Sequence, residues 1–345
     1  MQTNSLTIRQ SGFELMRIFA ILMIIAHHLS LHGVLNVGVY DSGNAINKLI
    51  TQLYFPGGET GVGLFFMITG YFLVKSDRKS NYIKLLLQVL FYGITLAVIA
   101  LYIYKEREFK FEILEIVKCV LVPISSLRWW FVSYYVLLLL MVPQLNVFVR
   151  RLNRKGFLLM LLILCVLEYM MQWIFVTQFL RISMAVFFYC LGAYLSVFEF
   201  KIRKITCVLL FVMSWSFYAL LQYYKIPFSF LIGKLNVVLC CITAFMFFKQ
   251  LNIHSNMINL VAKTTLGIYM IHDNDVLRSF IWNDVFKMTI QFSFEYYWLT
   301  SICTILSVFF IGMLLDFLRL KLLEPHYLKT ADRLCTKISN FIYNK

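Results

Sequence analysis

Arg17 and His28 are two ionisable residues within the first strongly apolar stretch of this 345-residue sequence, residues 13–31. Charge is costly inside a membrane-spanning segment, so a residue that keeps it there usually serves a function. Eleven residues of helix turn through about 20° more than three full turns, which puts both side chains on the same side, about 16 Å apart along the axis. His27 points away from that side.

The two residue types indicate acid–base chemistry. Histidine accepts a proton from a hydroxyl group near neutral pH, and arginine always carries a positive charge. If the helix lines a polar cavity, His28 can serve as a general base and Arg17 can bind an anionic group. A structural interpretation stays open, in which Arg17 pairs with Glu14 at the membrane surface and His28 is a buried, hydrogen-bonded histidine.

A metal site is the third interpretation of this segment. His28 and His32 are four residues apart, a spacing that puts two imidazoles on one face of a helix. The three residues between them include no glutamate, and the sequence offers no evident third ligand. We therefore expect no metal here.

The composition predicts the elements that must position these residues. The chain is 61% hydrophobic and 14% charged, and apolar runs of about 20 residues, the length that crosses a bilayer, recur from end to end. These runs are residues 13–31, 59–74, 82–104, 129–149, 157–176, 182–198, 205–223, 229–248, 264–282 and 297–318. We predict an all-α, polytopic membrane helix bundle of about ten transmembrane helices, in a single domain that covers residues 1–345.

The charge distribution predicts the orientation in the membrane. Most of the 32 Lys and Arg residues fall in segments on the same side as the N-terminus, so the positive-inside rule puts both termini in the cytoplasm. The net charge of +15 follows from this topology, and we expect no nucleic-acid binding. Residues 319–345 form a basic, amphipathic tail, which we expect on the lipid of the inner leaflet.

Two connections on the opposite side are longer than a turn. Residues 46–55 and residues 111–122 are the apolar or amphipathic centres of these connections. We predict that each forms a short interfacial helix that covers a cavity.

Four stretches of the chain resemble, in order, the membrane-bound acyltransferase 3 family. In the first stretch, FELMRIFAILMIIAHHLSLHG, the family's pattern of a basic residue, ten arbitrary residues and a histidine falls on Arg17 and His28. The other three are VGLFFMITGYFLV from Val62, RWWFVSYYVLLLLMVPQLN from Arg128, and TLGIYMIH from Thr265.

The resemblance implies a reaction. It implies transfer of an acyl group, usually acetyl, from cytoplasmic acetyl-CoA to a hydroxyl of a cell-surface glycan or lipid-linked saccharide, in the bacterial cytoplasmic membrane. His28 would be the general base, with a covalent acyl-histidine as the alternative role. Arg17 would meet the phosphates of the donor or hold its thioester arm.

The donor site would also use cytoplasmic cations that follow the second apolar run. Lys75, Arg78 and Lys84 are candidates for binding the phosphates of coenzyme A. The family commonly has an Arg-x-x-Arg step here, and Lys75 with Arg78 is the nearest match. The alternative is that these charges only fix the topology.

Three residues are candidates for binding the acceptor. Glu59 lies at the outer end of the second run, Trp130 begins the fourth run, and His272 lies in the ninth run beside several charges. Each also has a simpler interpretation: Glu59 faces water, Trp130 belongs to an interfacial aromatic belt, and His272 orients His28. The charges near His272 favour a polar cavity.

Other classes of membrane protein remain as alternatives. A transporter or flippase of lipid-linked sugars would suit ten spans and buried charges, but the sequence lacks the paired, interrupted segments of many transporters. A glycan polymerase would have a larger outer loop. A scaffold without catalysis would have little use for buried Arg, His and Asp.

Overall fold

The structure is a computed structural model that describes residues 10–76, 82–104, 129–174, 180–227 and 229–329. Helices make up 83% of it, and the described residues contain no strand. The predicted all-α class is therefore confirmed.

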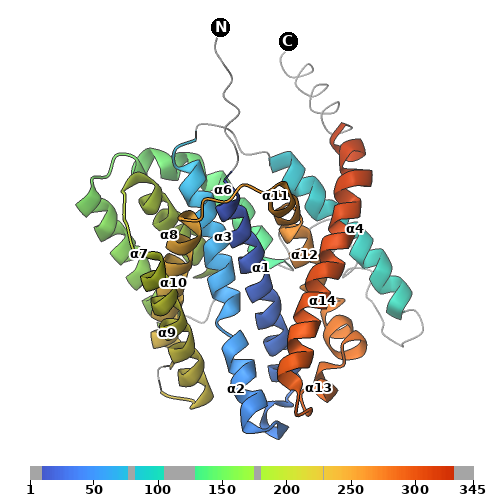
Figure 1. Cartoon of the computed structure of the whole chain (residues 1–345). Coiled ribbons are helices and arrows are strands. Elements are labelled where there is room, and N and C mark those ends of the chain that lie inside the picture. The colour runs from blue at the N-terminus through green and yellow to red at the C-terminus, as the bar shows by residue number, and fades with distance from the viewer. Residues whose placement is uncertain (1–9, 77–81, 105–128, 175–179, 228, 330–345) are drawn as a thin grey trace.

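Within the residues that the structure describes, nine long helices form the body of the bundle (Figure 1). They are α1 (Ser11–Ser30), α3 (Gly57–Leu73), α4 (Tyr82–Tyr104), α6 (Trp130–Val149), α7 (Arg154–Ile174), α8 (Leu180–Val197), α9 (Lys204–Tyr223), α10 (Ser229–Lys249) and α14 (Tyr297–Leu318). The shorter helices are α2 (Ala45–Tyr54), α11 (Asn256–Ala262), α12 (Thr265–His272) and α13 (Met288–Gln291).

The apolar runs of the sequence correspond closely to these long helices. Nine of the ten predicted segments contain one continuous helix each, and α4 has the predicted bounds. Among the described parts of the chain, six helical stretches are long and apolar enough to cross a membrane, as expected of a multi-pass membrane protein. The total of ten crossings and the cytoplasmic position of the termini stay predictions.

The ninth predicted segment, residues 264–282, is not one helix. Its helix α12 ends at His272, and a π-helix follows at Phe280–Val285. Between them the Asn274 Oδ1 atom accepts hydrogen bonds from the backbone N–H groups of Val276 (3.1 Å) and Leu277 (3.2 Å). Asn side chains compete in this way with the helical hydrogen-bond ladder, so the polar residues after His272 open the helix and turn the chain.

Helix α1 lies at the centre of the bundle. It contacts α2, α3, α10, α11, α12 and α14. In Figure 1, α7 to α10 stand on one side of α1 and α3, and α4 and α14 stand on the other. A helix surrounded by protein in this way can carry ionisable side chains without exposing them to lipid.

Helices α3 and α8 approach each other closely because each presents a glycine. A Cβ atom on Gly70 would collide with the backbone carbonyl of Tyr189, and one on Gly192 would collide with the backbone of Met67. Small residues at such crossings allow backbone-to-backbone packing in membrane proteins.

The amphipathic piece at residues 46–55 forms a helix as predicted, α2. The Asn44 side chain caps it by accepting a hydrogen bond from the Asn47 backbone N–H, 2.8 Å away. The Asn47 Nδ2 atom donates to the carbonyl oxygens of Phe292 (2.7 Å) and Phe294 (2.9 Å), which joins α2 to the segment before α14. The second predicted interfacial helix, residues 111–122, lies outside the described residues.

The tail at residues 319–345 is described only as far as residue 329. A π-helix, Arg319–Leu323, continues α14. The start of α1 and the end of α14 lie at the same end of the bundle (Figure 1). An even number of crossings would produce this arrangement.

Candidate active site

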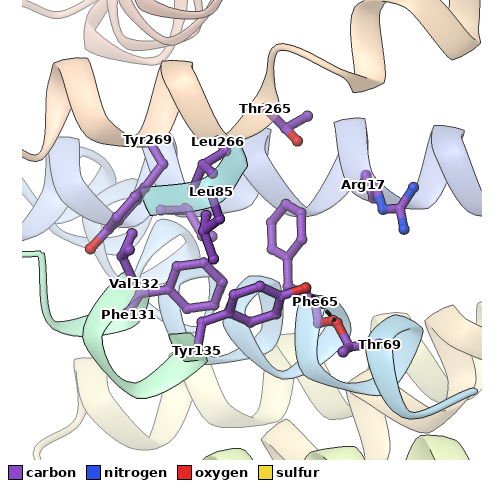
Figure 2. A pocket seen from close by; sticks show the side chains of 11 residues that line it. Arg17, Phe65, Thr69, Leu85, Phe131, Val132, Tyr135, Thr265, Leu266 and Tyr269 are labelled. Carbon is purple, nitrogen blue, oxygen red and sulfur yellow. Dashed lines mark hydrogen bonds between the residues drawn. The ribbon is translucent and has the colours of Figure 1, made fainter. Parts of the chain in front are cut away.

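A pocket with a volume of 120 Å³ lies beside α1, between Arg17 and Tyr269 (Figure 2). Most of its surface is apolar or aromatic, and the Arg17 guanidinium is its charged group. The lining residues are Arg17, Ile24, Phe65, Thr69, Leu85, Phe131, Val132, Tyr135, Thr265, Leu266 and Tyr269. An apolar slot with a cation at one end suits a ligand that has an apolar arm and an anionic portion.

Arg17 is both paired and available to this pocket. Its Nη1 atom donates hydrogen bonds to the two carboxylate oxygens of Glu14, at 2.7 and 2.8 Å. This confirms the pair that the spacing of three residues predicted. The Arg17 side chain remains 28% exposed and lines the pocket while it is paired with Glu14.

His28 lies further along α1 and is held by a second histidine. The Ile268 carbonyl oxygen lies 2.6 Å from His272 Nδ1, and His272 Nε2 lies 2.9 Å from His28 Nδ1. A carbonyl oxygen accepts only, so Nδ1 of His272 carries hydrogen and, in the neutral ring, Nε2 is an acceptor. His28 then donates from Nδ1, which leaves the lone pair of a neutral His28 on Nε2.

This chain of hydrogen bonds fixes the tautomer and orientation of His28. Its two imidazoles come from α1 and α12, 244 residues apart. A base held by a second group in this way is the arrangement that general-base and nucleophilic catalysis requires. The role of His272 as a residue that orients His28, one of the two interpretations of the sequence, agrees with this geometry.

Tyr269 lies between the pocket and His28. Its ring lines the pocket, and its ring centroid is 6.5 Å from that of His28 and 5.5 Å from that of Phe131. His28 itself does not line the pocket. The two aromatic rings therefore form a wall that separates the Arg17 end of α1 from the His28 end.

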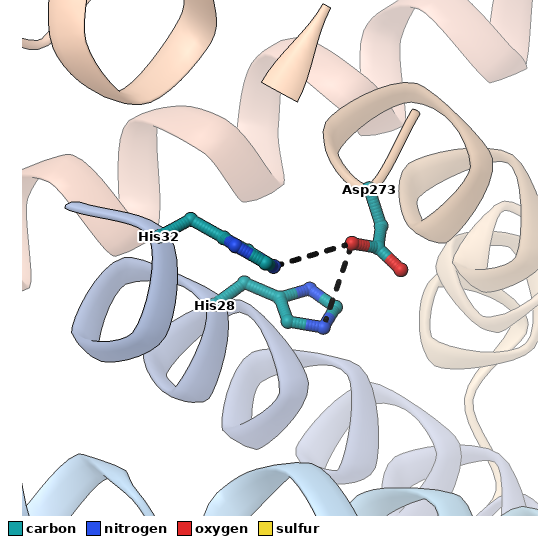
Figure 3. A group of neighbouring side chains, drawn as sticks. All are labelled: His28, His32 and Asp273. Atoms are coloured by element: carbon teal, nitrogen blue, oxygen red, sulfur yellow. Dashed lines mark ion pairs between the residues drawn. The ribbon is translucent and has the colours of Figure 1, made fainter. Parts of the chain in front are cut away.

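Beyond His28, Asp273 lies near its Nε2 atom, and His32 and Arg278 lie near Asp273. Asp273 Oδ1 lies 3.7 Å from Nε2 of His28 and 3.7 Å from Nε2 of His32 (Figure 3). Arg278 Nη1 lies 3.5 Å from the same Asp273 oxygen and 3.4 Å from His32 Nε2. The break after α12 makes this possible, because it turns Asp273 and Arg278 towards the end of α1.

His28, His32 and Asp273 form the set in the described residues that could hold a metal ion. Their nearest ligand atoms lie within 4.8 Å of one another. A zinc ion would need a ligand atom from each of the three residues at about 2.0–2.2 Å from the metal. Arg278 already presents a cation to both Asp273 and His32, which opposes a second cation there. Sequence spacing did not indicate Asp273 as a third ligand, because the spacing of residues does not reveal contacts across the bundle.

The predicted donor-site cations lie apart from one another. Lys75 Nζ donates to the Ser196 carbonyl oxygen at the end of α8 (2.5 Å), and Lys84 pairs with Glu324 after α14. Arg78 lies outside the described residues. Lys75 and Lys84 thus each bind a separate partner, and both interpretations of their charge, coenzyme A binding and topology alone, stay predictions.

A buried ion network surrounds Lys84 and its partner. Arg319 donates to Asp316 (2.6 Å) and Glu324 (2.7 Å), and Tyr92 donates to Asp316 (2.6 Å). Arg319 is 2% exposed, so the first residue of the predicted membrane-surface tail instead faces the bundle. Its charge needs these partners because an unpaired ion is costly in a buried site.

The three predicted acceptor residues also lie apart. Glu59 pairs with Lys234 of α10, a residue whose side chain is only 8% exposed. Trp130 is half-buried and its ring contacts that of Phe131. The neighbouring Trp129 is buried and donates to the Met270 carbonyl oxygen, 3.2 Å away. Of the three candidates, the structure brings only His272 to His28.

Comparison with known protein families identifies the family of this chain. The sequence pattern that describes the acyltransferase domain matches residues 10–318, nearly the whole chain. The chain belongs to the acyltransferase 3 family. No curated protein and no solved structure matches it. Membership supports an acyl-transfer activity on a membrane protein, and the family match includes the pocket, both imidazoles and the charged cluster.

Several residues of this acyltransferase were not singled out from the sequence as site residues. Tyr269, Asp273 and Arg278 lie near His28 only because α12 packs against α1 and then breaks. A signal was available for each, since Tyr269 precedes His272 by nearly one helical turn, Asp273 follows it directly and Arg278 comes six residues after it. The sequence could not show that this segment faces the end of α1.

Proposed function

We propose that the protein transfers an acetyl group from acetyl-CoA to a hydroxyl of a cell-envelope glycan, or of its lipid-linked precursor, in the bacterial cytoplasmic membrane. The observation that carries this proposal is the His28–His272–Ile268 chain of hydrogen bonds, which leaves a lone pair on His28 Nε2. Family membership supplies the reaction class, and the pocket beside Arg17 supplies space for a thioester arm.

The reaction balances with His28 as the base. The acceptor hydroxyl oxygen attacks the thioester carbonyl carbon, and its proton passes to His28 Nε2. The C–S bond then breaks, the thiolate of coenzyme A leaves, and the imidazolium returns the proton to that sulfur. Positive charge on His28 is shared with His272 through their hydrogen bond, while Asp273, 3.7 Å from Nε2, stabilises it electrostatically.

The positions of the groups along α1 support opposite sides for donor and acceptor. Arg17 lies near the start of α1, which the charge distribution assigns to the cytoplasm, and the cluster around Asp273 lies beyond His28 at the other end. Coenzyme A would therefore bind from the cytoplasm, with its phosphates near Arg17. The acceptor would approach from outside, and the Tyr269–Phe131 wall would have to open for the acetyl group to reach His28.

A pair of neighbouring histidines gives a direct test. In purified protein, His28→Gln should lower acetyl-CoA-dependent acyl transfer by about 10²- to 10⁴-fold, because the base is lost. His27→Asn is the matched control: His27 Nδ1 lies 2.7 Å from the Phe55 carbonyl oxygen, and an asparagine amide can make the same donation. Transfer that persists in His28→Gln would contradict the proposal.

Release of free coenzyme A distinguishes this function from a transporter or flippase, because neither breaks a thioester. The measurement is thiol release from acetyl-CoA, with and without a glycan acceptor. In cells, deletion of the gene should remove acetyl esters from a surface polysaccharide. An unchanged acetylation pattern together with no thiol release would favour the transporter.

A further inference from the structure

The cluster beyond His28, which consists of Asp273, Asp275 and Arg278, has the properties of a ligand site. Asp273 is 3% exposed, and Arg278, with 28% of its side chain exposed, reaches it from the segment after α12. Arg278 also pairs with Asp275, which is exposed. The cluster thus extends from the buried Nε2 atom of His28 to partly exposed charges.

The spacing of the two buried acceptor atoms suits hydroxyl groups. His28 Nε2 and Asp273 Oδ1 are 3.7 Å apart, which is too long for a hydrogen bond between them, since such bonds measure about 2.5–3.2 Å. Each atom can instead accept a hydrogen from a separate hydroxyl. Two hydroxyls on adjacent carbons can meet both atoms at once, because their oxygens lie side by side.

Arg278 completes the set by supplying a donor. Its Nη1 atom lies 3.5 Å from Asp273 Oδ1, so a hydroxyl oxygen beside that carboxylate can accept from the guanidinium while it donates to Asp273. Paired carboxylate and guanidinium groups satisfy both the donor and the acceptor of one hydroxyl. A metal ion is a poorer occupant, because the guanidinium is a cation in the same space.

We propose that Asp273 and Arg278 bind the hydroxyl next to the one that His28 deprotonates, so that the acceptor is a vicinal diol of a saccharide. This inference rests on the proposed function and specifies its acceptor. Asp273, Asp275 and Arg278 together carry one net negative charge, which favours a neutral sugar over a uronate or phosphate at this position. Asp273 remains ionised and exchanges no proton; it orients the diol and holds the attacking oxygen near Nε2.

Small alcohols test the diol requirement without knowledge of the natural glycan. The probes are cis- and trans-1,2-cyclohexanediol, with cyclohexanol as the matched acceptor that lacks the second hydroxyl. The full-length protein in detergent receives acetyl-CoA and one probe. Release of free thiol and the mass of the acetate ester are measured. At least one diol isomer should react about 10- to 100-fold faster than cyclohexanol, as expected for a hydrogen bond to a charged group.

Variants locate the effect in the cluster. Asp273→Asn and Arg278→Gln should each reduce the diol-to-cyclohexanol rate ratio towards one. Two variants are used because substitution of the buried Asp273 can prevent folding. Asp284→Asn changes an exposed carboxylate in the same part of the chain and should keep the wild-type ratio. Because the ratio compares two acceptors in one preparation, a change in the amount of folded protein does not alter it.

The outcomes separate this inference from the function on which it rests. Equal rates for the diols and cyclohexanol in the wild-type protein would overturn the diol site and leave acyl transfer standing. A ratio that persists in both Asp273→Asn and Arg278→Gln would also overturn it. If no thiol is released with water or with any alcohol, this result would contradict the proposed function itself and, with it, the diol site.

Discussion

At the scale of single residues, the reactivity of His28 depends on what its other nitrogen does. Its Nδ1 atom lies 2.9 Å from His272 Nε2, and His272 in turn is oriented by the Ile268 carbonyl oxygen. Without that partner the proton of a neutral His28 can move to Nε2, and the lone pair then faces away from Asp273. His272 is therefore a positioning residue, whose effect should appear in turnover more than in donor binding.

We expect His272→Leu to lower kcat by at least about tenfold, because the tautomer of His28 is no longer fixed. His272→Gln should retain more activity, since its amide oxygen can still accept the hydrogen from His28 Nδ1. The KM for acetyl-CoA should change little in both. Equal activity of the Leu and Gln variants would contradict a role that depends on this hydrogen bond.

Arg17 gives a second prediction at this scale. If its guanidinium binds the phosphates of coenzyme A, Arg17→Gln should raise the KM for acetyl-CoA by about tenfold or more. The same variant should leave the KM for S-acetylpantetheine, which lacks the nucleotide, unchanged. An equal loss with both donors would instead assign Arg17 to the thioester arm. Arg17→Gln also removes the ion pair with Glu14. Arg17→Lys, which keeps the charge, is therefore the companion variant.

At the scale of elements, close packing of helices holds the two halves of the site in register. Helix α3 contacts both α1 and α8, and the glycines at the α3–α8 crossing allow the backbones to meet. The pocket uses Phe65 and Thr69 of α3 opposite Arg17 of α1. A change in the α3–α8 distance would therefore be expected to alter the pocket as well as the stability.

Gly70→Ala tests this packing. The new methyl group would strike the Tyr189 carbonyl oxygen, and overpacking of this kind costs about 1–3 kcal/mol. Gly156→Ala is the control, because a Cβ there first meets the Asn153 Oδ1 atom at 3.3 Å. Thermal unfolding in detergent should show a lower midpoint for Gly70→Ala alone. Equal midpoints would show that the α3–α8 crossing has room to relax.

At the scale of the whole molecule, the proposed reaction needs two sides of a membrane. The donor pocket begins near the start of α1, and the Asp273 cluster lies beyond its end. Buried charges near the ends of the long helices, such as Lys234 with Glu59 and Arg319 with Asp316, are each paired within the bundle. Pairing of this kind lets ionisable groups stay inside an apolar structure.

Single cysteines can test the orientation. Lys201 lies between α8 and α9 and Lys225 between α9 and α10, and both are exposed. With the termini in the cytoplasm, a membrane-impermeant maleimide should label Lys225→Cys in intact cells and Lys201→Cys only after permeabilisation. The parent protein measures the background from its own cysteines. The reverse pattern would invert the topology and place the Arg17 pocket outside.

The class of the protein and most of its helices could be predicted from local properties of the sequence. The length of an apolar run is a local property, and crossing a hydrocarbon layer requires a fixed length of helix, so segments such as 82–104 could be delimited by inspection. Helical periodicity is local too, and it related Arg17 to Glu14 and to His28 on one side of α1. Where polar side chains competed with the helix, as after His272, the same reasoning missed the break.

The packing of the helices, in contrast, determines which distant side chains meet. His28 and His272 are 244 residues apart, and Lys84 and Glu324 are 240 apart; no periodicity links such positions. Their contacts arise because buried polar groups must find partners wherever the packed helices bring them. For the same reason the candidates Glu59, Trp130, Lys75 and Lys84 were plausible by residue type, yet packing gave them separate neighbours and brought Asp273 and Arg278 to His28 instead.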